Sequence, residues 1–207
     1  RPSCCKCVWG EGVPKCISSA PRPSDRWKAS VSPDCWMRNA TYFTRIFSKL
    51  VGSSGTVWAF EPHPESYRIL KKNIDQAKYG NVISVQKAIL GKTEEVKFFG
   101  MTMPAKHGIL DASLVNPHIK VEKSFYVEAV TIDSFLEDYR GKRIHLIKID
   151  IEGAEYEVFK NFKNLQNTSA LIGEVHTDLF PQDATEFIKL LSLFELETEV
   201  YDRSDRY

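Results

Sequence analysis

The chain lacks the features that would place it in several large classes of protein. No cysteine follows residue 35, so disulfides cannot staple its main body as they do in small secreted proteins. No apolar run approaches the roughly 20 residues that span a bilayer. The N-terminus also lacks the apolar core of a signal peptide. These absences predict a soluble, cytoplasmic protein with no membrane partner.

Other absences concern charge and metal ligands. Lysine and arginine number 28 against 27 acidic residues, a net charge of +1, whereas a nucleic-acid partner would favour a clear basic excess. The cysteines are Cys4, Cys5, Cys7, Cys16 and Cys35. They do not provide the two Cys-x-x-Cys pairs of a zinc site, since Cys4 and Cys7 have no matching second pair. We assign no metal ligand, although Asp150 and Glu152 could ligate magnesium.

What is present divides at residue 38. Residues 1–38 are rich in Cys, Pro, Ser, Arg and Trp, and they show neither helical nor strand periodicity. From Asn39 the pattern is regular, so we expect an irregular segment over 1–38 and one domain over 39–207. With 207 residues, the chain is long enough for an α/β domain with a substantial core.

Strand and helix patterns alternate through this domain. Helices are expected at 40–51, 64–77, from 153, and at 181–194, and strands at 56–60, 81–86, 144–149, 170–175 and 195–201. Segments 95–99 and 125–132 alternate like an antiparallel pair, and the loop between them, 100–121, is long enough for a substrate lid. The alternation predicts an α/β fold with a doubly wound, mainly parallel sheet. The apolar face of the first helix is expected to consist of Tyr42, Phe43, Ile46, Phe47 and Leu50. In the second helix, apolar residues recur at helical spacing: Tyr67, Leu70, Ile74 and Ala77.

Because doubly wound sheets bind ligands beyond the carboxyl ends of their strands, the residues there are the candidate site. Glu61 closes the strand at 56–60, about 20 residues past the first turn, where a carboxylate can accept hydrogen bonds from both hydroxyls of a ribose. The alternative role is that of an acid favoured by the dipole of the helix that begins at Pro64.

Two further strand ends carry titratable groups. Lys148, Asp150 and Glu152 alternate to one side of an extended chain, and Gly153 allows a tight turn into the next helix. These charges either contact a ligand or form an ion pair that only caps the helix. Glu174 and His176 end the next strand, where His176 is either a base for a substrate hydroxyl or a structural histidine.

These segments together resemble the FkbM-type methyltransferase family. The resemblance rests on Asn39 to Thr44, Val57 to Pro64, Ala88 with Gly91, Val130 to Asp133, Lys148 to Glu155 and Ile172 to His176. It implies a Rossmann-like class I fold that binds S-adenosylmethionine and methylates a hydroxyl on a saccharide or another small-molecule acceptor.

The resemblance also implies roles for individual residues. Asn39, Glu61, Ala88 and Asp150 would bind the cofactor, with Glu61 on the ribose and Ala88 beside the adenine. The candidate bases for the acceptor hydroxyl are Asp150, Glu152 and His176.

The chain departs from the family in its first loop, Asp-x-Gly-Ala-Asn-x-Gly. Met37 and Thr41 stand where the glycines belong, and Met37 would obstruct a close backbone approach to the cofactor. Reading Asp34-Cys35-Trp36-Met37 from the third base of the Asp34 codon gives Leu-Leu-Asp with any codon choice. This is the expected end of the first strand, so we hypothesise that residues before about Asn39 are translated out of frame. Sequencing the underlying nucleic acid tests this.

Two other functions compete with methyl transfer. Glu61 would suit the ribose of a nicotinamide cofactor in an oxidoreductase equally well, although the chain has no Gly-x-Gly-x-x-Gly loop. The fold could also serve as a non-catalytic binding module, which would show no affinity for S-adenosylmethionine.

Overall fold

A computed structural model describes residues 39–102, 107–109, 116, 118–137, 143–163, 165–173 and 184–192. The described residues form two compact units, one of 39–89 with 94–129 and the other of 90–93 with 130–192. We call these the Glu61 unit and the Asp150 unit. The predictions made for residues 1–38, for Glu174 and His176, and for a strand at 195–201 concern residues outside this description.

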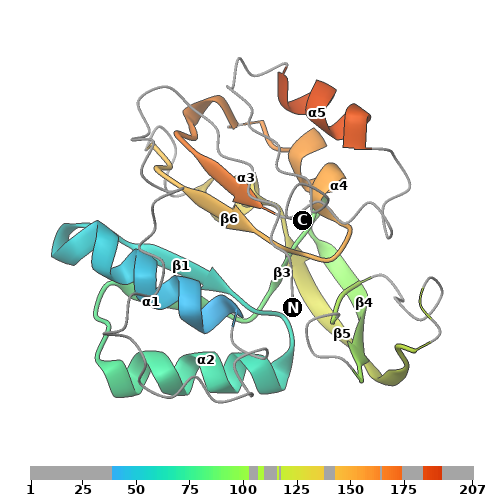
Figure 1. Ribbon diagram of the computed structural model, residues 1–207, viewed down its shortest axis with the longest axis horizontal. Coiled ribbons are helices and arrows are strands. Elements are labelled where there is room, and N and C mark those ends of the chain that lie inside the picture. Colours follow the sequence, from blue (N-terminus) through green and yellow to red (C-terminus); the bar gives the residue numbers. More distant parts are fainter. Residues whose placement is uncertain are drawn as a thin grey trace, which may run out of the picture. The chain divides into compact units, whose positions relative to one another are not determined.

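The Glu61 unit begins with a helix, strand, helix and strand in the predicted order. These are α1 (Asn39–Val51), β1 (Val57–Phe60), α2 (Pro64–Ala77) and β2 (Val82–Val85). β1 and β2 pair in parallel, with Val57 opposite Val82. Figure 1 shows α1 beside β1 and α2, and these elements are in contact. Ala59, Leu70 and Ile74 form a buried cluster between β1 and α2, which explains why this helix packs on this strand.

Side-chain and backbone chemistry fixes the ends of these helices. Gly52, which follows α1, has φ +64°, a conformation that glycine adopts without steric cost. The Asn81 amide nitrogen donates to the carbonyl oxygens of Ser48 and Gly52, each at 2.8 Å, and its oxygen accepts from the Ser48 hydroxyl at 2.6 Å. Asn81 therefore joins the C-terminal end of α1 to the start of β2.

A three-stranded sheet completes the Glu61 unit. β3 (Ala88–Ile89), β5 (Val121–Val130) and β4 (Glu94–Met101) lie in that order. β4 and β5 pair antiparallel, with Phe98 opposite Phe125, which confirms the predicted antiparallel pair. Phe99 also forms a bridge with Gly108, so this part of the expected 100–121 loop is hydrogen-bonded to β4.

The Asp150 unit contains the second parallel pair. Its elements are α3 (Ile132–Phe135), β6 (Ile147–Ile149), α4 (Glu155–Lys160), a 3-10 turn at Leu165–Asn167, β7 (Leu171–Gly173) and α5 (Ala184–Ser192). β6 and β7 are parallel. The buried side chains of Phe159 and Phe187 pack edge to face at 5.8 Å between α4 and α5. The described residues thus form a mixed α/β fold with two parallel strand pairs, and the doubly wound order remains a prediction.

Several local predictions were wrong. Tyr42 and Leu50 are 58% and 73% exposed, so they do not belong to the inward face of α1. The strand expected to end at Ile132 stops at Val130 because the Thr131 hydroxyl accepts from the Ser134 N–H at 2.9 Å and caps α3.

Candidate functional site

Glu61 lies where the sequence placed it, directly after β1. Its N–H donates to the Val85 carbonyl at 3.1 Å, which continues the parallel pairing one residue beyond the strands. Its carboxylate accepts from the His63 N–H at 2.9 Å. Burial disfavours the charged form and raises the pKa of Glu61 to about 7, although the His63 N–H acts in the opposite direction. This carboxyl group therefore changes charge near neutral pH.

His63 connects this turn to the antiparallel sheet. The side chain is only 3% exposed, and its Nδ1 accepts from the Ser66 N–H at 3.5 Å at the start of α2. Its ring stacks on His107 with centroids 4.3 Å apart and planes 12° apart, and meets Phe125 edge to face at 5.3 Å. Sequence analysis assigned no role to either histidine, since 43 residues separate them in the chain.

Ala88 and Asn39 are the other cofactor candidates of the Glu61 unit. Ala88 is buried and opens β3, three residues beyond β2. Asn39 is the first residue of α1. The neighbouring Lys87 forms an ion pair with Glu128 of β5. Ala88 is thus the small residue near the end of β2 that the prediction requires.

In the Asp150 unit, Asp150 follows β6 and pairs with Lys148. The Lys148 Nζ lies 2.8 Å from Asp150 Oδ2, and the two side chains are 10% and 16% exposed. This is the ion pair that sequence analysis gave as the alternative to a ligand contact. The two roles are compatible, because a lysine that holds a carboxylate in place also orients it.

Glu152 and Gly153 form the turn between β6 and α4. Glu152 has φ +53° and Gly153 has φ +99°, so the chain is not extended as far as Glu152, contrary to the predicted alternation. A left-handed conformation is unfavourable for a glutamate and persists only where surrounding contacts hold it. Glu152 is nearly buried, at 9% exposure.

Glu155 supplies those contacts, and its role was missed from the sequence. Its side chain is fully buried. The carboxylate accepts from the Ile151 N–H at 3.1 Å and the Gly153 N–H at 3.0 Å. An acid in the first turn of a helix, just after a glycine, is the signal that could have indicated this, because such residues bond main-chain donors at a helix start.

Two other segments of the resemblance have structural roles in the Asp150 unit. A Cβ at Gly91 would lie 2.5 Å from the Glu157 carbonyl oxygen, so only glycine allows this approach to α4. The Asp133 carboxylate accepts from the Lys163 N–H at 2.7 Å. These residues support the fold rather than a ligand.

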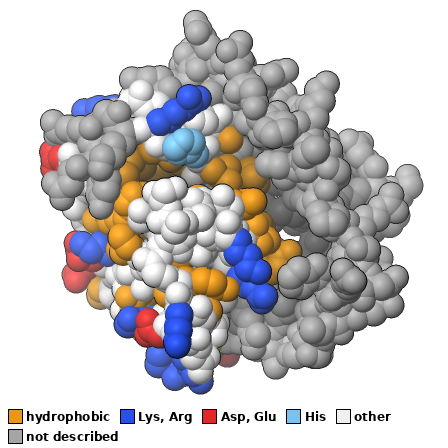
Figure 2. Space-filling view, turned by 90° about the vertical axis from the view of Figure 1, so that its left-hand side faces the viewer, with side chains coloured by type: hydrophobic (Ala, Val, Ile, Leu, Met, Phe, Trp, Pro, Cys, Tyr) orange, Lys and Arg blue, Asp and Glu red, His pale blue; other side chains and the backbone are white. Residues whose placement is uncertain are grey.

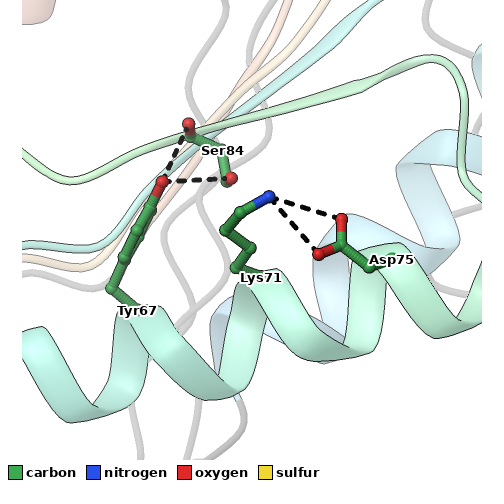
Figure 3. A network of polar contacts seen from close by, with 4 residues as sticks. All are labelled: Tyr67, Lys71, Asp75 and Ser84. Atoms are coloured by element: carbon green, nitrogen blue, oxygen red, sulfur yellow. Dashed lines mark hydrogen bonds and ion pairs between the residues drawn. The ribbon is translucent and has the colours of Figure 1, made fainter.

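An open groove of about 490 Å³ lies along α2, and sequence analysis did not predict it. It is lined by Pro64, Tyr67, Arg68, Lys71, Lys72, Asp75, Gln76 and Gln86. Figure 3 shows how polar contacts order its wall: the Tyr67 hydroxyl lies 3.4 Å from Ser84 Oγ, and Lys71 pairs with Asp75. Figure 2 is turned about the vertical axis from Figure 1, and it shows lysine, arginine and acidic side chains near the bottom, the level at which α2 lies in Figure 1. Glu61 does not line this groove.

Within the described part of the chain, no group of three or more His, Cys, Asp or Glu side chains is arranged to hold a metal ion. None of the helices there has the length and apolar character needed to cross a membrane.

The chain is similar to known methyltransferases. It is 28% identical over 152 residues to the hexuronic acid methyltransferase AglP of Haloferax volcanii. The aligned part covers 73% of this chain and 59% of that protein. It is 25% identical over 165 residues to Methyltransferase 1 of Beauveria bassiana, covering 72% of this chain and 63% of that protein. The chain thus spans about three-fifths of the length of these relatives. No solved structure matches it significantly.

A family model gives the broadest match. The model described as the methyltransferase FkbM domain matches residues 33–202, which include Glu61, Asp150 and the turn held by Glu155. This confirms the resemblance stated from the sequence: the chain belongs to the FkbM methyltransferase domain family.

Proposed function

We propose that this chain binds S-adenosylmethionine and transfers its methyl group to a hydroxyl oxygen of a saccharide or a similar small-molecule acceptor. The observation that carries the proposal is Glu61, a largely buried carboxyl group at the carboxyl end of a parallel strand, with a pKa raised to about 7. Membership of the methyltransferase family supports the reaction class. The name of the Haloferax volcanii relative supports a sugar acid as acceptor.

On the cofactor side, the residues of the Glu61 unit fit a ribose. A carboxylate that burial destabilises gains most from new hydrogen-bond donors, and the two ribose hydroxyls are such donors. Ala88, a small side chain three residues beyond β2, would contact the flat base, and Asn39 at the start of α1 is the third candidate contact. When bound, S-adenosylmethionine would supply an electrophilic methyl group on a positively charged sulfur.

On the acceptor side, the residues of the Asp150 unit would orient the hydroxyl and remove its proton. Asp150 is the favoured contact, because Lys148 restrains its carboxylate at 2.8 Å and a restrained group aligns a reacting atom with less entropic cost. Glu152, on the turn that Glu155 holds, is the second candidate base, and His176 remains the third.

Methyl transfer from isotopically labelled S-adenosylmethionine tests the function. We expect label in a glycan that ends in a hexuronic acid and less in the matched neutral glycan. Asp150→Asn should lower kcat by about 100-fold or more. The Asp75→Asn variant serves as control, because Asp75 is exposed on α2 and pairs with Lys71. Label in no hydroxyl-bearing acceptor, together with binding of a nicotinamide cofactor instead, would overturn the proposal.

A further inference from the structure

The His63–His107 stack in the Glu61 unit is not explained by cofactor binding or by ordinary core packing. Each Nδ1 accepts a main-chain N–H, from Ser66 at 3.5 Å for His63 and from Met101 at 2.9 Å for His107. Each ring is therefore neutral, with its proton on Nε2. His63 Nε2 is buried with no hydrogen-bond partner among the described residues. A phenylalanine would fill the same space without this cost, so stability alone does not account for a histidine here.

Burial, with the nearby Lys123, favours the neutral form of both rings. Burial and the nearby Lys123 lower the pKa of His63, against an opposing effect of Glu65. Burial, followed by His63 and Lys123, lowers the pKa of His107 to about 4. Two neutral rings can stack at 4.3 Å, whereas two cations would repel. The stack therefore persists at the pH at which Glu61 ionises.

The same residues tie the Glu61 turn to the hairpin of β4 and β5. The His63 main chain binds the Glu61 carboxylate, while its ring contacts His107, which follows β4, and Phe125 of β5. Gly100 of β4 borders the same cluster, since a Cβ there would lie 3.1 Å from Lys123 Cγ and 3.4 Å from His63 Nε2. Lys123 of β5 pairs with Glu65 of α2 at 2.6 Å and forms a second connection beside the first.

We infer that His63 and His107 are positioning residues for Glu61: their stack fixes the Glu61–His63 turn against the β4–β5 hairpin, so the placement of the hairpin controls how well Glu61 receives the cofactor ribose. This rests on the proposed function for the ribose contact. The link between the histidines and Glu61 rests on the contacts alone.

A double-mutant cycle on the 207-residue chain tests the coupling. We expect His107→Ala to weaken binding of S-adenosylhomocysteine by about tenfold, because a displaced carboxylate loses its aligned hydrogen bonds. His107→Phe, which keeps a flat ring on His63, should stay within about threefold of the parent. In a Glu61→Ala background, His107→Ala should have almost no further effect. An equal loss of affinity in both backgrounds would overturn the inference.

A measurement without cofactor separates this inference from the proposed function. The Glu61 carboxyl carbon can be titrated by NMR in the free chain. We expect His107→Ala to lower the pKa of Glu61 toward its ordinary value as the turn opens to water, and His107→Phe to leave it near 7. If the parent chain binds no S-adenosylhomocysteine but the titration shifts as stated, the proposed function fails and the positioning role stands. An unshifted pKa in a folded His107→Ala variant would contradict the positioning role.

Discussion

Titration of Glu61 provides the sharpest prediction, because a ribose is held best by the ionised carboxylate and burial raises the pKa of this group to about 7. At pH 6 about one Glu61 in eleven is ionised, and at pH 8 about ten in eleven. If the two ribose hydroxyls bind only the ionised form, the affinity for S-adenosylhomocysteine should rise by about tenfold between pH 6 and pH 8. His107, which stacks on His63 of the Glu61 turn, does not titrate in this interval, because burial lowers its pKa to about 4.

As the pH rises, ionisation of Glu61 should strengthen cofactor binding but lower the stability of the fold. Glu61 has an ordinary pKa of 4.5 when unfolded and about 7 when folded, so the native state retains the proton longer. Its ionisation begins to destabilise the fold above pH 4.5, and the full effect is reached above pH 7. The difference between these two pKa values corresponds to a loss of about 3 kcal/mol in the free energy of unfolding. Glu61→Gln removes the charge, so at pH 8 it should raise the free energy of unfolding by at most about 3 kcal/mol while weakening cofactor binding.

Isothermal titration calorimetry between pH 6 and pH 8 and urea unfolding at pH 5 and pH 8 make both measurements on the same samples. We expect the parent affinity to rise with pH, a flat profile for Glu61→Gln, and a gain in stability for this variant at pH 8 that is much smaller at pH 5. Asp75→Asn is the matched control, because Asp75 belongs to the same unit and its carboxylate is exposed. A parent affinity independent of pH, or a Glu61→Gln variant that binds as tightly as the parent, would refute the reasoning.

Three further changes test the supporting structure by urea unfolding. Glu155→Ala leaves two main-chain donors without their buried acceptor and should cost about 3 kcal/mol, whereas Glu157→Ala on the exposed face of α4 should cost less than about 0.5 kcal/mol; equal costs would contradict the role of Glu155. Asn81→Ala removes three hydrogen bonds between α1 and β2 and should cost about 2 kcal/mol, and a loss below about 0.5 kcal/mol would refute this. Lys148→Met removes a nearly buried partner of Asp150 and should cost about 2 kcal/mol, and adding Asp150→Asn should restore part of this loss without restoring methyl transfer.

Much of the fold could be predicted because its signals are local. The apolar spacing of α2, its proline at the first turn and the short apolar run of β1 all lie within a few residues of one another. The position of Glu61 followed from the same local pattern, since a strand end and a helix start bracket it. The antiparallel pairing of β4 and β5 was predicted from alternation alone.

The remaining features depend on contacts between distant residues or on backbone strain. His63 and His107 meet only because the chain after β4 lies beside the start of α2, and no periodicity in the sequence predicts that contact. The shorter helix α4 follows from the positive φ values of Glu152 and Gly153. Gly153 indicated a turn, whereas nothing in the sequence indicates the left-handed backbone conformation of Glu152. The exposure of Tyr42 and Leu50 on α1 likewise depends on what packs against that helix.

A crystal structure of the chain with S-adenosylhomocysteine would show whether Glu61 binds the ribose. We expect both ribose hydroxyls within hydrogen-bond distance of the Glu61 carboxylate, which also keeps its bond from the His63 N–H. A ribose bound elsewhere, with Glu61 contacting only His63, would contradict this expectation.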